Sequence, residues 1–129
     1  MSTKKILCID NEPKRIDTYI TKLRDSGYTV IFASTGAEGL QMAKSEKPDL
    51  ILLDLKMPDM NGIEVFSKLH EDPELKDIKV IFLTAFSDPT IPETDFYFAK
   101  DIGATDFVRK GLGLEEFMAK IQSHLEPGA

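Results

Sequence analysis

The residues of this sequence that are best suited to chemistry come directly after its most apolar segments. An acidic turn, Asp10-Asn11-Glu12, follows the first segment, and Asp54, Thr84 and Lys110 stand at the ends of three others. Where such ends meet, carboxylates about 4 Å apart repel by about 4 kcal/mol at an effective dielectric of about 20, so a cation is needed among them. Lys110 supplies one positive charge. Oxygen ligands without nearby His or Cys favour Mg²⁺ or Mn²⁺ over zinc for the remainder.

Five candidate strands would position these residues. Three are short runs rich in Ile, Leu and Val, and two are more mixed in composition. They are KKILCI (4–9), DLILLD (49–54) and KVIFLT (79–84), with the mixed segments YTVIFA (28–33) and TDFVRK (105–110). Apolar residues at helical spacing lie between them, in residues 13–26, 36–45, 62–70 and 114–125. Pro13 suits the first turn of a helix, and Gly27 suits a helix end.

The alternation of strands and helices predicts the fold class. Near-continuous apolar strands indicate a parallel sheet that is covered on both faces, because crossover connections between parallel strands are almost always right-handed. We therefore expect an α/β, doubly wound sheet of five parallel strands with helices on both faces. In such sheets the ligand site lies beyond the carboxyl ends of the strands. Asp10, Asp54, Thr84 and Lys110 all fall at that edge.

Length and composition restrict the remaining possibilities. The chain has 129 residues and a formal charge of −6, without a basic stripe, so we expect one domain and no direct contact with nucleic acid. No apolar stretch approaches the roughly 20 residues of a membrane span, and the apolar part of MSTKKILCID is too short for a signal peptide. We expect a cytoplasmic protein with no membrane contact. The single cysteine, Cys8, excludes an internal disulfide and is expected in the core.

From Lys4 to about Leu125 the sequence resembles the receiver domain of two-component response regulators, and in particular the stand-alone, chemotaxis-regulator-like kind. Four motifs carry the resemblance, in the same order along the chain. They are the acidic turn of residues 10–12, DLKMPDMNG (54–62), Thr84-Ala85, and GATDFVRK (103–110). The resemblance implies a flavodoxin-like strand order, 2-1-3-4-5, and a single receiver domain over residues 1–129 with its core at about 4–125.

The resemblance implies a phosphoacceptor role for Asp54. Its carboxylate would take a phosphoryl group from a histidine kinase or phosphotransfer protein in a Mg²⁺-dependent step. Asp10, Asn11 and Asp54, with the backbone carbonyl of Lys56, would hold the metal. Such a receiver is not an enzyme in the ordinary sense, because it catalyses only its own phosphorylation and dephosphorylation.

The resemblance also implies a two-state switch. Thr84 and Lys110 would act with the phosphoacceptor, and Thr84 would donate its hydroxyl to the new phosphoryl group. This movement would let Phe107 turn from solvent to the interior. The surface that changes would be the fourth helix, the fifth strand and the fifth helix, which would bind a downstream protein. Receivers often pair through the same surface, so a homodimer is a further expectation.

Three departures from the family pattern affect these expectations. Asn11 stands where the family usually has a second metal-binding Asp, so we expect weaker Mg²⁺ binding. Gly111 follows Lys110 where the family has a proline with a cis bond; without proline that bond costs about 3–4 kcal/mol, which favours a trans bond and a shifted loop. Residues 86–97, with prolines at positions 89 and 92, predict a delayed or reshaped fourth helix.

Several other functions compete with this interpretation. Asn11 and Gly111 favour a receiver that is not phosphorylated and works as an interaction module. A receiver excised from a longer regulator or hybrid kinase is also compatible, although the end of the chain at Ala129 predicts a stand-alone protein. A phosphatase of the haloacid dehalogenase type would need an Asp where Lys56 stands. A flavodoxin-like cofactor binder would need a Gly, Ser or Thr-rich loop after the first strand, and Asn11-Glu12-Pro13 is unsuited to that role.

Overall fold

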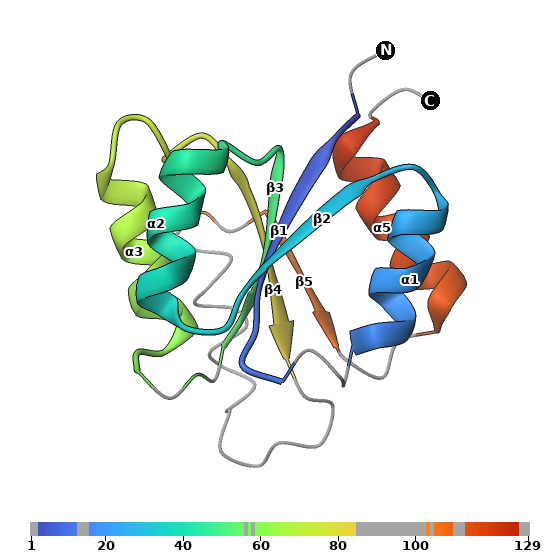
Figure 1. Cartoon of the computed structure of the whole chain (residues 1–129), viewed down its shortest axis with the longest axis horizontal. Coiled ribbons are helices and arrows are strands. Elements are labelled where there is room, and N and C mark those ends of the chain that lie inside the picture. The colour runs from blue at the N-terminus through green and yellow to red at the C-terminus, as the bar shows by residue number, and fades with distance from the viewer. Residues whose placement is uncertain are drawn as a thin grey trace.

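Five parallel strands form one sheet in the order β2-β1-β3-β4-β5 (Figure 1). The computed structural model describes residues 3–12, 16–55, 57, 59–84, 103, 105–109 and 113–126, with the backbone alone at Thr84 and Arg109. The strands are β1 (Lys5–Ile9), β2 (Thr29–Ala33), β3 (Leu50–Asp54), β4 (Lys79–Thr84) and β5 (Asp106–Arg109). The predicted fold class and strand order are confirmed.

Helices cover both faces of the sheet within the described residues. Figure 1 shows α1 and α5 on one side and α2 and α3 on the other. Their bounds are α1 (Asp17–Asp25), α2 (Gly36–Glu46), α3 (Gly62–Glu71) and α5 (Leu114–Leu125). The fourth helix expected near residues 86–97 lies outside the part of the chain that the structure describes.

Strand residues alternate between two apolar cores, one on each face of the sheet. Both cores are fully buried, which is why the strand sequences are apolar throughout rather than alternating with polar residues. The core beneath α1 and α5 takes Ile6, Cys8, Leu50, Leu52, Ile81 and Leu83 from the strands. The core beneath α2 and α3 takes Leu7, Ile9, Ile51, Leu53, Val80 and Phe82. Cys8 is buried, as its position in the strand predicts.

Side chains cap α2 and α3, two of the helices that begin at the carboxyl edge of the sheet. The Thr35 hydroxyl accepts the backbone N–H of Glu38 at 3.1 Å at the start of α2. The Asn61 side chain accepts the N–H of Glu64 at 2.9 Å at the start of α3. Each bond satisfies an N–H that the helix itself leaves without a partner. The starts of α2 and α3 are therefore fixed locally.

The opposite edge of the sheet is tied to the last turn of α5. Asp106 at the start of β5 accepts His124 Nε2 at 3.0 Å and lies 3.4 Å from Lys120 Nζ. Lys79 Nζ at the start of β4 donates to the carbonyl of His124. Burial raises the pKa of the Asp106 carboxyl, but hydrogen bonds from His124 and from the Phe107 N–H, with the charge of Lys120, outweigh it, so this pKa lies below its ordinary value.

The two histidines, both on described helices, differ in exposure. The side chain of His124 is only 24% exposed, because Asp106 lies against it. His70 is exposed, and its ring stacks on Phe66 with centroids 5.4 Å apart.

Candidate functional site

Two buried carboxylates lie side by side in the register of the sheet. Ile9 of β1 pairs with Leu53 of β3; Asp10 directly follows β1 and Asp54 is the last residue of β3, so the two acids come next along this register. Asp10 is 1% exposed and Asp54 is 5% exposed. These are the buried charged residues of the described part of the chain. Because buried carboxylates are costly unless they are paired, hydrogen-bonded or bound to a metal, their position marks the edge as a candidate site.

The backbone around Asp10 holds it in place. Its N–H donates to the carbonyl of Ala33 at 3.0 Å, which continues the pairing of β1 with β2. Its Oδ1 accepts the N–H of Glu12 at 2.8 Å, as in an Asx turn. Asn11 and Glu12 are both exposed. The turn therefore directs the acid inward and leaves the next two residues at the surface.

The site continues toward β4 and β5 through the backbone register. Asp54 pairs with Leu83, and the N–H of Leu55 donates to the Leu83 carbonyl at 3.1 Å. Thr84 is the next residue and pairs with Arg109. The backbone of Thr84 thus lies at the same edge as Asp54. The Thr84 side chain, Lys56 and Lys110, together with Gly111, lie outside what the structure describes.

The loop after β3 returns tightly onto the strand end. The N–H of Gly62 donates to the carbonyl of Leu55 at 2.8 Å, and Met57 is 9% exposed. A Cβ at Gly62 would lie 2.5 Å from the carbonyl oxygen of Asp54 and 2.8 Å from Leu55 Cα. Only glycine allows α3 to begin this close to the backbone of Asp54.

Asp59 is a residue of the site that sequence reasoning missed. Its carboxylate accepts the N–H of Gly36 at 2.9 Å and the N–H of Ala37 at 3.0 Å, at the start of α2. The Gly36 N–H, and next the Ala37 N–H, hold the pKa of Asp59 below its ordinary value. In the sequence Asp59 resembles any turn-forming acid. Its partners lie 23 and 22 residues away, so no local signal points to them.

Phe107 is half-buried in β5, an outermost strand of the sheet. It pairs with Phe82 in the register and packs against the core beneath α2 and α3. Lys120 Nζ of α5 lies 6.0 Å from the centroid of its ring. The residue predicted to switch therefore has contacts both with the interior and with α5.

The donor chemistry of the described site fits a hard divalent cation. Asp10 and Asp54 offer carboxylate oxygens, and the exposed amide of Asn11 follows Asp10 directly. Mg²⁺ in proteins is typically bound through one or two carboxylates, with water and substrate phosphate oxygens completing its shell. No group of three or more His, Cys, Asp or Glu side chains with metal-binding geometry occurs among the described residues. The two carboxylates and the neighbouring amide oxygen therefore match the ligand set that is typical of Mg²⁺.

Comparisons with known proteins identify the family. Residues 6–122 match the response regulator receiver domain family, and the chain belongs to it. Over 92% of its length it is 39% identical to the transcriptional regulatory protein KdpE of Mycobacterium tuberculosis, of which it covers 49%. Over 94% of its length it is 32% identical to protein PilH of Pseudomonas aeruginosa, of which it covers 97%.

A solved structure agrees with the same assignment. The crystal structure of a CheY-like response regulator receiver domain protein from Methanospirillum hungatei JF-1 has a TM-score of 0.84 and 30% sequence identity, and the match covers 97% of this chain and 95% of that one. The chain spans about half the length of the first curated relatives that it matches. In the described residues, no helix has both the length and the apolar character that crossing a membrane requires.

Proposed function

We propose that the chain is a phosphoacceptor signalling receiver in which Asp54 takes a phosphoryl group from a histidine kinase or phosphotransfer protein. The observation that supports this most directly is the buried carboxylate of Asp54 at the end of β3, in register beside Asp10. A carboxylate at the carboxyl edge of a parallel sheet lies where such folds bind their ligands, while its backbone is held by strand pairing.

The proposed step exchanges one bond to phosphorus for another. A carboxylate oxygen of Asp54 attacks phosphorus in line and forms an acyl phosphate, while the donor's bond to phosphorus breaks and the donor leaves with the electron pair. Mg²⁺, when bound, neutralises charge on the transferring group. Asp10, Asn11, Asp54 and the carbonyl of Lys56 would hold it. Lys110 would add a second positive charge.

The proposed output is a change in the surface around β5 and α5. Thr84 would donate a hydrogen bond to the phosphoryl group, worth about 1.5–3 kcal/mol, which is comparable to a gap of a few kcal/mol between conformers. Phe107 is already half-buried and has no hydroxyl that would need a partner inside the core, so the inward state costs little. The fourth helix, β5 and α5 would then bind a downstream protein or a second copy of the chain.

Intact mass spectrometry tests the proposal. The protein is incubated with acetyl phosphate and Mg²⁺, and Asp54→Asn is treated in parallel. The parent should gain the mass of one phosphoryl group, and Asp54→Asn should gain none. Omission of Mg²⁺ should abolish the gain. A parent that gains no mass with any small phosphodonor or divalent metal would contradict the phosphoacceptor role.

Asn11 favours a second candidate function, an interaction module that works without phosphorylation. Replacing the family's usual second acid by an amide removes a unit of negative charge from the metal site. In that case the chain would bind its partner equally well with and without acetyl phosphate, and Asp54→Asn would leave that binding unchanged.

The partners and location follow from the same proposal. A kinase or phosphotransfer protein would approach the carboxyl edge of the sheet, and the net charge of −6 makes direct nucleic acid contact unfavourable. Two-component phosphorelay would place the protein in the cytoplasm.

A further inference from the structure

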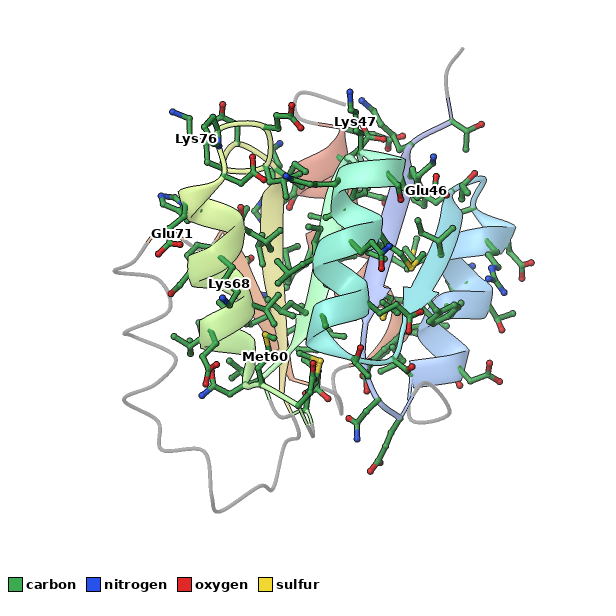
Figure 2. All side chains as sticks on the ribbon, turned by 60° about the vertical axis from the view of Figure 1, so that its left-hand side comes forward. Glu46, Lys47, Met60, Lys68, Glu71 and Lys76 are labelled. Atoms are coloured by element: carbon green, nitrogen blue, oxygen red, sulfur yellow. The ribbon has the colours of Figure 1, made fainter. Side chains whose placement is uncertain are left out.

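The loop that follows β3 is joined to the first turn of α2. The two oxygens of Asp59 accept the N–H groups of Gly36 and Ala37 at 2.9 and 3.0 Å. These groups lack partners within the helix, and the positive end of the helix dipole attracts a carboxylate. The Met60 side chain also packs against Gly36: it lies so close that a Cβ on Gly36 would be 2.5 Å from Met60 Cγ. Figure 2 shows Met60 at the end of the molecule where α2 and α3 begin.

The same turn of α2 is also held in place relative to Asp10. Residues 34–35 alone separate the end of β2 from α2, and the carbonyl of Ala33 accepts the N–H of Asp10 at 3.0 Å. One turn further along α2, Gly39 lies so close to Ile9 that a Cβ there would be 2.5 Å from Ile9 Cδ1. The position of α2 is therefore set by β1, directly before Asp10.

Asp59 consequently connects the two acidic sides of the site. Asp54 is linked to Asp59 along the chain, by the loop in which the Gly62 N–H donates to the Leu55 carbonyl. Asp10 is linked to the Asp59 carboxylate through hydrogen bonds, first to Ala33 at the end of β2 and then from Gly36 at the start of α2. We propose that Asp59 is a positioning residue for phosphoryl uptake, which braces this loop against α2 and so maintains the spacing of Asp54 and Asp10 that a divalent cation requires. The inference rests on the proposed function. Mg²⁺ demands near-ideal octahedral geometry, so small displacements of a ligand weaken its binding.

A matched control separates this role from ordinary helix capping. Thr35 caps the same end of α2 through the N–H of Glu38, and among the described residues its side chain makes no hydrogen bond to Asp59 or Met60. Thr35→Ala therefore weakens α2 but leaves the brace in place. Asp59→Ala removes both acceptors, and Asp59→Asn keeps one acceptor without the charge. Asp59→Asn also serves if Asp59→Ala does not fold.

Three measurements on the full chain are compared across these variants. The first is amide hydrogen exchange at Gly36 and Ala37 without metal. The second is the Mg²⁺ dissociation constant from amide chemical shifts, since the chain has no Trp to report binding by fluorescence. The third is the rate of phosphorylation by acetyl phosphate at saturating Mg²⁺.

If Asp59 braces the loop, Mg²⁺ affinity and phosphorylation rate should fall in order from the parent to Asp59→Asn to Asp59→Ala. Asp59→Ala should exchange faster at both amides and bind Mg²⁺ roughly tenfold more weakly, within the range seen when partners behind metal ligands are removed. Its phosphorylation rate at saturating Mg²⁺ should fall several-fold, with Asp59→Asn between Asp59→Ala and the parent. Thr35→Ala should stay within about twofold of the parent in Mg²⁺ affinity and phosphorylation rate, even if its melting temperature falls as far as that of Asp59→Ala.

Two results from the Asp59→Ala protein would overturn the inference. One is an Asp59→Ala protein whose Mg²⁺ affinity and phosphorylation rate match those of Thr35→Ala. The other is unchanged exchange at Gly36 and Ala37 in Asp59→Ala. A parent that binds Mg²⁺ but gains no phosphoryl group refutes the proposed function instead, and the metal affinities of the variants then decide the role of Asp59. A parent that does neither overturns both.

Discussion

Replacing Gly62 by alanine should destabilise the protein, although the same change usually stabilises a helix. The added methyl carbon would lie 2.5 Å from the Asp54 carbonyl oxygen and 2.8 Å from Leu55 Cα, against about 3.0 Å for the closest contacts that Cβ atoms make. Both neighbours are backbone atoms, so no side chain can rotate away. Either α3 or the end of β3 must move by roughly half an ångström, and overpacking of this kind costs about 1–3 kcal/mol.

Urea unfolding followed by circular dichroism measures the effect. In thermal unfolding of a chain of this length, a loss of about 1–3 kcal/mol lowers the melting temperature by roughly 4–12 °C. Gly113→Ala is the control, because a Cβ there meets none of the described residues within 4 Å. Gly113 precedes α5 as its N-cap, so the control should lose no more than about 1 kcal/mol. A Gly62→Ala protein as stable as the parent, with an unchanged m value, would show that the strand end yields freely and that the reasoning is wrong.

Three further predictions concern charge. Asp54→Asn should raise the free energy of unfolding by about 1 kcal/mol in EDTA, because it removes repulsion from Asp10, and added Mg²⁺ should cancel the gain; equal denaturation curves in EDTA would contradict this. Asn11→Asp should tighten Mg²⁺ binding severalfold in a calorimetric titration, since it restores a negative ligand, and weaker binding would count against a metal contact there. Asp106→Asn should be less stable than the parent by about 1 kcal/mol or less above about pH 4. Because the folded-state pKa of Asp106 is lowered, this contribution disappears as pH falls through that pKa, so the two urea curves should converge in acid; a constant gap would refute the pairing.

The strands were predictable because burial on both faces leaves a strong local signal. YTVIFA and TDFVRK, the two mixed segments, contain β2 and β5, each of which begins one residue later than predicted. The order of the strands came from the family resemblance, because apolar patterns do not specify which strands are neighbours. Asp10 and Asp54 could be placed at one edge from sequence, since parallel strands end on the same side.

Contacts between distant residues account for what sequence reasoning missed. Asp59 carries no local mark of its bonds to Gly36 and Ala37, because a turn-forming acid has the same sequence context. The partial burial of His124 comes from its contact with Asp106, which is 18 residues away and which the place of His124 on a helix does not reveal. In both cases the deciding interaction joins two elements whose relative position is fixed only when the sheet has formed.

The ties at the last turn of α5 limit how that helix can respond to events at the opposite edge of the sheet. Lys79 and Asp106 hold the carboxyl-terminal turn to two strands at once, through the carbonyl and the ring of His124. With that turn as a pivot, a tilt of α5 would move most the end that begins at Leu114, where apolar packing such as the Tyr19–Phe117 ring stack at 4.2 Å holds the helix instead. A small rearrangement near the site would then produce its largest displacement at the first turn of α5 and almost none at the last.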